Sequence, residues 1–306
     1  MSGRRRGLPA PLPPWLVLGA LLGGLLGLGG VAEAGGVAVL TDSRVAQYRE
    51  AQAAAKELLR EAPVLEASAP DIVQQIERVS PSVVLAIGQK ALQTAQQAGA
   101  TVVFCMVLGP SAVSSRTVTG LRLEVAPEAQ LDSFRRVYPS ARRLGVIYDS
   151  KTWSGYLAEA TKAAASRGFT LVPKPVSDGR EVRAALNDIA GDIDALWLIP
   201  DPQLISAEMF NFLLVFTLEH KIALFGFFES FTRAGALASV APDYTAIGRQ
   251  AAKLASDLAA KPAETRLPVP PSVPSPGVLT INVRTARQLG IDVADEVQAR
   301  AKQVYR

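Results

Sequence analysis

Short apolar runs alternate with longer amphipathic segments along the chain from residue 36 onward. In the first part of the chain, the pattern predicts strands at 36–40, 63–67, 82–87 and 101–108, and helices at 44–61, 70–79 and 89–97. A run with polar alternation at 118–124 is interpreted as a crossover or an edge strand. Strands that alternate with helices in this way are typical of a parallel sheet covered by helices on both faces.

The same alternation then begins a second time. It predicts strands at 143–148, 169–172, 195–199, 222–228, 236–240 and 278–283, and helices at 127–137, 153–167, 180–189, 203–219, 244–260, 285–288 and 294–304. Two such series predict an α/β protein with two doubly wound parallel-sheet lobes and a ligand cleft between them.

Two neighbouring strands of the second series end at acidic residues. The run 222–228 is followed directly by Glu229 and Ser230, and the run 236–240 leads to Asp243 and Tyr244, where Asp243 is placed to cap the next helix. Because the carboxyl ends of parallel strands meet at one edge of a sheet, we expect these residues to lie together where ligands bind in open α/β sheets.

Polar residues follow the other predicted strands as well. Free N–H groups at helix starts suit a carboxylate, buried carboxylates suit an ammonium group, and aromatic rings supply flat apolar walls. A zwitterion with an apolar side chain, such as an aromatic amino acid, would find a partner in each of these three kinds of group. The polar candidates are Thr41, Asp42, Ser43, Ser68, Gly88, Gln89, Gly109, Ser111, Asp149, Ser150, Pro200, Asp201, Glu229, Ser230 and Asp243.

Each candidate also has a purely structural interpretation. For Asp201 and Glu229, which follow apolar runs directly, a helix-dipole role competes with ligand contact. Trp153 packs on its own lobe or lines the cleft, and of Phe227 and Phe228 we expect one in the core and one at the cleft, because side chains alternate along a strand. We favour helix capping for Asp42, Ser43, Asp149 and Ser150, each taken alone.

Composition and motifs exclude several functions. The net charge of +4 is mild, half of it comes from the first 34 residues, and no basic stripe argues for nucleic acid. No glycine-rich phosphate loop or GxSxG motif is present. With one His, His220, which we expect at a helix C-terminus, and one Cys, Cys105, which we expect to be buried, we predict no catalytic residues, no metal site and no cofactor.

The N-terminus has the pattern of a targeting segment. Three arginines at 4–6 precede an apolar run at 15–28, and Ala32-Glu33-Ala34 fits a small-x-small cleavage site. An uncleaved anchor is the alternative, but the apolar run is shorter than the roughly 20 residues that span a bilayer. We therefore expect a signal peptide at 1–34, cleaved near Ala34, and a periplasmic protein that is not a lipoprotein because no Cys lies there.

One segment carries a resemblance to a known family. The residues FGFFES and AGALASVAPDYTAIGRQAA, between 225 and 252, resemble ABC-type substrate-binding proteins of the tryptophan/tyrosine-binding kind. The resemblance runs from about Val37 to the C-terminus and implies a type I periplasmic binding protein fold. It further implies a solute-binding component of an ABC importer, with a small organic solute and an inner-membrane permease as partners, and we expect a monomer.

The resemblance also assigns residues. AIGQKALQTA places Gly88 and Gln89 at the cleft, ALWLIPDPQLIS places Asp201 there, and in FGFFES Glu229 keeps its place while two phenylalanines replace small and acidic residues. Other expected polar positions are changed, because Leu108-Gly109-Pro110 stands in place of Thr-Asp-Pro, Ser154-Gly155 in place of Asn-Ser, and 42–44 in place of His-Pro. The cleft is therefore expected to be more apolar. The predicted ligand-binding residues are Asp42, Gly88, Gln89, Ser150, Asp201, Phe228, Glu229 and Tyr244.

In the family the chain passes between the lobes three times, and here we place the passages near Val118, near Ala241 and in the proline-rich connector 262–276. The N-terminal lobe is then 35–118 with about 242–268, and the C-terminal lobe is 119–241 with about 277–306. The alternative to transport is a sensory or assembly module on the same fold. An enzyme on this scaffold is the third possibility, and it would require turnover and a perturbed general base.

Overall fold

The computed structural model describes residues 36–108, 115–201, 206–266 and 277–306. The predicted signal peptide, the turn at Gly109 to Ser111, the start of the helix predicted at 203–219 and most of the proline-rich connector lie outside the described residues. Within the described ranges, no helix is both long enough and apolar enough to cross a membrane.

The first sheet has five parallel strands in the order β2-β1-β3-β4-β5. They are β1 (Val37–Thr41), β2 (Val64–Glu66), β3 (Val83–Ile87), β4 (Val102–Val107) and β5 (Val118–Arg122). The helices between them are α1 (Ala46–Leu58), α2 (Ile72–Val79) and α3 (Gln89–Gln97). Strand β5 pairs only with β4, so the alternating run at 118–124 is the expected edge strand.

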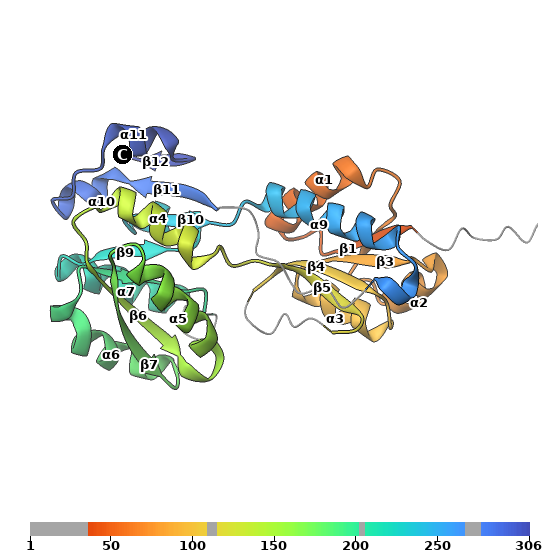
Figure 1. Cartoon of the computed structure of the whole chain (residues 1–306), viewed down its shortest axis with the longest axis horizontal. Helices are drawn as coiled ribbons and strands as arrows, with labels where there is room; N and C mark the ends of the chain where they lie inside the picture. The colour runs from red at the N-terminus through yellow and green to blue at the C-terminus, as the bar shows by residue number, and fades with distance from the viewer. Residues whose placement is uncertain (1–35, 109–114, 202–205, 267–276) are drawn as a thin grey trace, which may run out of the picture. The chain divides into compact units, whose positions relative to one another are not determined.

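The second sheet has seven strands in the order β12-β11-β10-β9-β8-β6-β7 (Figure 1). The strands are β6 (Arg143–Asp149), β7 (Thr170–Val176), β8 (Ala195–Trp197), β9 (Ala223–Gly226), β10 (Ala238–Ala241), β11 (Val278–Asn282) and β12 (Gln303–Tyr305). The helices that follow β5 in the chain are α4 (Pro127–Val137), α5 (Ser150–Ala165), α6 (Val182–Ile189), α7 (Ala207–Glu219), α8 (Glu229–Ala234), α9 (Tyr244–Ala259), α10 (Val283–Gln288) and α11 (Asp295–Arg300). Short 3₁₀ turns lie at Gly179–Glu181, Ala190–Asp192 and Ala263–Thr265.

The α/β prediction with two sheets is confirmed, but the end of the chain differs from the expectation. The helix predicted at 294–304 is wrong in its second half, because α11 ends at Arg300 and residues 303–305 form β12, parallel to β11. The run Gln303-Val304-Tyr305 gains backbone hydrogen bonds at the sheet edge that a frayed helix end would lack. Strand β11 itself runs antiparallel to β10, so the second sheet is mixed.

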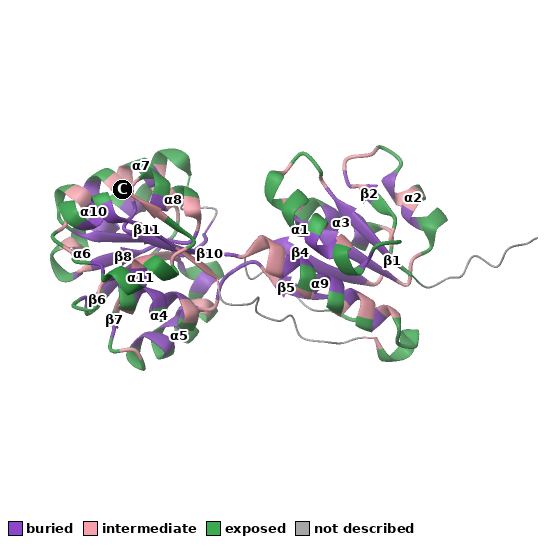
Figure 2. Cartoon of the chain, turned by 90° about the horizontal axis from the view of Figure 1, so that it is seen from above, coloured by how far each residue is buried: buried purple, intermediate pink, exposed green. Residues whose placement is uncertain are grey.

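Burial on both faces explains the long apolar runs of the first sheet. Strands β1, β3 and β4 are buried along their whole length (Figure 2). Side chains of alternate residues enter two different clusters, so Val39 packs with α1 residues while Leu40 packs with residues of α2 and α3. This is the pattern of a parallel sheet covered on both sides, and it accounts for the absence of polar alternation.

Helix α9 follows β10 of the second sheet but covers the first sheet beside α1 (Figure 1). Its N-terminus is capped by Asp243, as predicted, with the Asp243 carboxylate accepting from the Ala246 N–H at 2.9 Å. At Gly248 the two helices are in backbone contact, since a Cβ added there would lie 2.1 Å from the Ala51 carbonyl oxygen. The close approach therefore requires glycine at 248.

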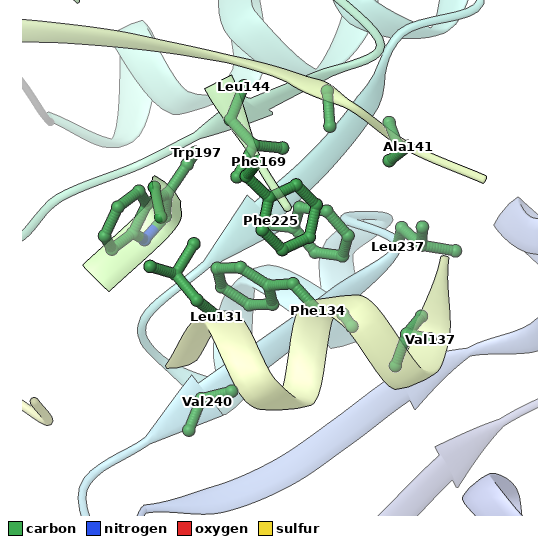
Figure 3. Close-up of a cluster of buried hydrophobic side chains, with 14 of the residues drawn as sticks. Leu131, Phe134, Val137, Ala141, Leu144, Phe169, Trp197, Phe225, Leu237 and Val240 are labelled. Carbon is green, nitrogen blue, oxygen red and sulfur yellow. The ribbon is translucent and has the colours of Figure 1, made fainter. Parts of the chain in front are cut away.

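An aromatic cluster forms the core of the second sheet (Figure 3). The Phe134 ring of α4 stacks on Phe225 of β9 at 4.1 Å between centroids and meets the edge of Trp197 of β8 at 6.0 Å. The Trp197 indole N–H donates to the Gln130 side-chain oxygen at 3.0 Å, so this buried polar group is satisfied. Trp153 is 1% exposed and packs in the same core, so of its two interpretations the one in which it packs on its own lobe is correct.

The α1–α9 contact gives a testable expectation with a matched control. We expect Gly248→Ala to lower the free energy of unfolding by about 1–3 kcal/mol, because the added methyl group must push two backbones apart. Gly155→Ala in α5 meets no atom within 4 Å and should raise stability by ~0.5–1 kcal/mol through backbone entropy. Urea unfolding of both variants checks this, and equal stabilities would contradict the close contact.

Candidate ligand-binding site

A cavity of about 740 Å³ lies at the carboxyl ends of strands from both sheets. This volume is in the range of sites for small organic molecules. Four predicted residues line the cavity, namely Gln89, Phe228, Glu229 and Tyr244. The predicted residue Gly88 directly precedes Gln89 in the chain. The full lining is Val45, Gln47, Tyr48, Gln89, Met106, Leu108, Leu123, Phe228, Glu229, Ser230, Arg233 and Tyr244.

The lining is mainly apolar and aromatic, and its charged groups come from one helix. Glu229 begins α8 and Arg233 follows one turn later. Residues four apart lie on the same side of a helix, so a carboxylate and a guanidinium group face the cavity from neighbouring positions. Such a set of groups offers hydrogen bonds and opposite charges, and the part of the lining that the structure describes contains no His that could activate the Ser230 hydroxyl. Among the described residues, no group of His, Cys, Asp and Glu side chains is arranged to hold a metal ion.

The start of α3 is covered by an aromatic ring. Gly88 is the N-cap residue, has a φ of +96°, and offers no side chain to the helix N–H groups. The Tyr48 ring lies so close that a Cβ at residue 88 would be 2.4 Å from its Cε2 atom. The Tyr48 hydroxyl faces the Gln89 backbone N–H. The pKa of this phenol is raised, mainly because the side chain is buried and to a smaller degree because the Asp42 carboxylate is near. Both the backbone angle and the ring therefore require glycine.

Strand β4 changes its register at the cavity wall. The pairing with β5 shifts between Phe104 and Val107, and Met106 has a φ of +59°. The irregularity brings two consecutive side chains, Cys105 and Met106, into the same cluster, while Val107 enters the opposite one. Backbone outliers of this kind are concentrated at functional sites, because the surrounding structure must hold them. Burial raises the pKa of the Cys105 thiol to about 12, which keeps it protonated.

Helix α8 is anchored by buried hydroxyl groups. The Thr232 hydroxyl donates to the Ser239 hydroxyl at 2.7 Å and accepts from the Thr280 hydroxyl at 2.8 Å. The Asn282 side-chain amide donates to the Thr232 carbonyl oxygen at 2.9 Å. At the first residue of the helix, the Glu229 carboxylate accepts from the Tyr305 hydroxyl at 2.9 Å. The cavity-facing residues of α8 are thus fixed from β10, β11 and β12.

The two neighbouring phenylalanines, Phe227 and Phe228, lie on opposite sides of the chain, as expected. Phe227 is 7% exposed and lies in the core cluster beneath α7, while Phe228 lines the cavity. Tyr148 is half-buried against the second core. His220 is the C-cap residue that follows α7, with its Nδ1 atom 2.8 Å from the Phe216 carbonyl oxygen. The position of His220 matches the helix C-terminus that was expected for it.

Four predicted site residues do not line the cavity, and Gly88, the chain neighbour of Gln89, is the first of them. Asp42 pairs with the Arg44 guanidinium, whose hydrogen bonds lower the pKa of this carboxyl to about 2. Ser150 is exposed at the first turn of α5. Asp201 is 1% exposed, accepts from the Asp149 N–H at 3.2 Å and lines a separate cavity of about 20 Å³.

The capping interpretation holds for one of four residues. Asp149 caps α5, since its carboxylate accepts from the Lys151 N–H and the Thr152 hydroxyl, each at 2.9 Å. For Asp42 and Ser43 it is wrong, because α1 starts after Val45, which makes no side-chain cap, and the Ser43 N–H donates to Glu66. For Ser150 it is also wrong, because this residue is already inside α5.

Several lining residues were missed at the sequence level. Arg233 carried a usable signal, since it lies four residues after Glu229 in a predicted helix. Tyr48 lies early in the helix after the first strand, where its ring can reach the strand ends, and this too was readable. Met106 gave no signal, because a register shift is not visible in local periodicity. Tyr305, which does not line the cavity but contacts Glu229, gave none either, because the two residues are 76 apart in the sequence.

Comparison with known proteins places the chain in a family. Residues 39–305 match the family model described as ABC transporter substrate binding protein. The chain belongs to this family. Its members are substrate-binding proteins and not enzymes.

A tyrosine-binding protein of Clostridioides difficile (strain R20291) is 27% identical over 143 residues. The match covers 46% of this chain and 41% of the relative, so it spans less than half of the length of either protein.

Solved structures share the fold. An ABC domain from Streptococcus pneumonia in complex with L-Trp has 19% identity and a TM-score of 0.61, covering 88% of this chain and 99% of the other. A conserved domain protein from Vibrio cholerae has 23% identity and a TM-score of 0.61, with 89% and 100% covered. A ligand-free, open substrate-binding protein with adhesive properties from Clostridium difficile has 16% identity and a TM-score of 0.69, with 89% and 99% covered. At these identities the likeness shows the fold, which is that of the type I periplasmic binding proteins.

The Tyr48 ring over Gly88 leads to a second prediction. We expect Gly88→Ala to destabilise the protein by about 1–2 kcal/mol through the positive φ, and by more through the collision with Tyr48. Gly99→Ala also has a positive φ, +68°, but meets no atom within 4 Å, so it should show the backbone cost alone.

A double-mutant cycle in chemical denaturation measures the collision itself. Gly88→Ala combined with Tyr48→Ala should cost about 1–2 kcal/mol less than the sum of the single changes. Additive costs would show that the ring does not press on residue 88.

Proposed function

We propose that this chain is the solute-binding component of an ABC-type importer and binds a small, amino-acid-like solute with an apolar or aromatic side chain. The observation that carries the proposal is the apolar cavity into which α8 presents one carboxylate and one guanidinium group. A lining of this kind selects a molecule with a hydrophobic body and a few charged groups.

The chemistry of the lining matches a zwitterion. The Glu229 carboxylate would accept the ammonium group, and Arg233 or the Gln89 amide would bind the carboxylate. Rings of Tyr48, Phe228 and Tyr244 would pack against the side chain, and a ring face also favours a neighbouring cation. The tyrosine-binding relative and the L-Trp complex support an aromatic amino acid.

We further propose two lobes around this site. The first sheet with α9 would form the N-terminal lobe. Because β5 of this sheet ends at Arg122, the first segment of the lobe would run from 35 to about 122 instead of the predicted 118, and its second segment would be about 242–268. The second sheet would form the C-terminal lobe, from about 123 to 241 with about 277–306. Hinge closure around the solute would create the form that an inner-membrane permease recognises. The arginines at 4–6 and the apolar run at 15–28 support export to the periplasm, with cleavage near Ala34.

Thermal unfolding of the chain from Gly35 tests the binding function. L-Tryptophan, L-tyrosine, other amino acids, small carboxylates and apolar organic solutes are screened. At a ligand concentration of about 100 times Kd, binding to the native state adds ~2.7 kcal/mol, which corresponds to a rise of about 5–10 °C in the midpoint. A saturable rise with aromatic amino acids is expected. No rise with any solute would favour the sensory or assembly module.

A pair of variants tests the role of the carboxylate. Glu229→Gln keeps the side-chain shape and the acceptor for Tyr305 but removes the charge, so we expect at least a tenfold loss of affinity for L-tryptophan. Glu128→Gln is the control, since Glu128 also lies in the first turn of a helix, α4, but does not line the cavity. Isothermal titration calorimetry measures both, and similar affinities for the two variants would exclude Glu229 as a ligand contact.

A further inference from the structure

Strand β12 brings the end of the described chain to the proposed site. Its three residues pair in register with β11, with Tyr305 opposite Asn282. Further contacts secure the segment, because the Lys302 N–H donates to the Leu279 carbonyl oxygen at 2.8 Å and the Arg284 guanidinium donates to the Arg306 carbonyl oxygen at 2.8 Å. The position of Tyr305 is therefore set by the sheet and by the residues on both sides of it.

Tyr305 forms a hydrogen bond with a charged group of the cavity lining. Its hydroxyl donates to the Glu229 Oε1 atom at 2.9 Å in a partly buried position. Burial raises the pKa of Tyr305, and the adjacent Glu229 carboxylate raises it further, so the phenol remains a proton donor at neutral pH. A hydrogen bond to one carboxylate oxygen restricts the rotamers of the side chain and leaves the second oxygen available to a ligand.

Helix α8 depends on such contacts because it is short. A helix of six residues is not stable by itself in water, so its orientation is imposed by neighbouring strands. Two strands hold it at adjacent points of the same register. Asn282 of β11 donates to Thr232 in the middle of the helix, and Tyr305, directly across from Asn282, donates to Glu229 at its start. The first contact holds the middle of the helix, and the second holds its first turn together with the Glu229 carboxylate.

We infer that Tyr305 is a positioning residue for ligand binding, which orders the Glu229 carboxylate for the ammonium group of an amino-acid-like solute. The inference rests on the proposed function in its choice of ligand. It makes β12, which contributes no residue to the cavity lining, part of the binding apparatus. A carboxylate that is already ordered loses less side-chain entropy when the ligand binds.

The first experiment compares Tyr305→Phe with the wild type, both beginning at Gly35. The variant keeps the ring and its packing and removes only the hydroxyl donor. Titration calorimetry with L-tryptophan should show an affinity about 5- to 10-fold weaker. Binding of 3-(indol-3-yl)propanoate, which lacks the amino group, should change less than about twofold, because no ammonium group meets Glu229. Equal weakening for both ligands would overturn the inference and leave a general structural role.

Two further variants isolate the path through Glu229. In a Glu229→Gln background, Tyr305→Phe should have no additional effect on the ratio between the two ligands. Tyr138→Phe is the matched control, since this half-buried tyrosine is the C-cap residue of α4, packs against the core of the same sheet and does not line the cavity. It should leave both affinities unchanged, and an equal effect would overturn a specific role for Tyr305.

A second measurement does not require a ligand. Amide hydrogen exchange of residues 229–234 in unliganded protein should be several-fold faster in Tyr305→Phe, with the amides of α4 unchanged. Unchanged exchange in 229–234 would overturn the inference whatever the protein binds. Faster exchange in a protein that binds none of the tested solutes would keep the positioning role and reject the proposed function.

Discussion

The backbone contact between α9 and α1 is the constraint on which the arrangement of the chain depends. Helix α9 follows β10 of the second sheet, yet its apolar face is buried in the core of the first sheet. Without α9, part of the apolar surface beside α1 on β3 and β4 would be exposed to water, a cost of ~25 cal/mol for each Å² of apolar surface. The first sheet is therefore complete only after most of the second sheet has been synthesised, and the two cannot be separated by cutting the chain once.

This arrangement also explains why the cavity lining is drawn from distant parts of the sequence. Parallel strands end at a common edge, so each βα connection contributes one or two residues to the same place. The first sheet and its helices contribute most of the apolar wall, including the Tyr48 ring over Gly88 and the strained Met106 of β4. The second sheet contributes the charges, on a short helix held by a buried network of hydroxyl groups. Rigid strands beneath a site limit the conformational entropy that is lost when a ligand binds.

Much of the fold was predictable because its elements are local patterns. Continuous apolar runs predicted the buried strands, and the cap at Asp243 was visible from the sequence. The failures come from contacts that the pattern does not contain. Asp42 resembled a cap, but the Arg44 guanidinium competes for its carboxylate. The end of the chain resembled a helix, but hydrogen bonds from β11 stabilise a strand.

The site was predictable only where it coincides with strand ends. Gln89, Phe228, Glu229 and Tyr244 follow that rule and line the cavity. Asp201 follows it too, yet its side chain is buried beneath the second sheet, because a strand end has two faces and periodicity alone does not say which one is occupied. Long-range partners such as Tyr305 require the three-dimensional structure.

The two tryptophans of the described chain both lie in the core of the second sheet. Trp153 and Trp197 belong to one aromatic cluster, and the third tryptophan of the sequence, Trp15, falls in the predicted signal peptide. In a chain beginning at Gly35, tryptophan fluorescence excited outside the tyrosine absorption band therefore reports on the packing around Phe134 and carries no emission from the first sheet. Circular dichroism averages over the helices of both sheets. A gap between the two unfolding curves would thus reveal which of the two cores melts first.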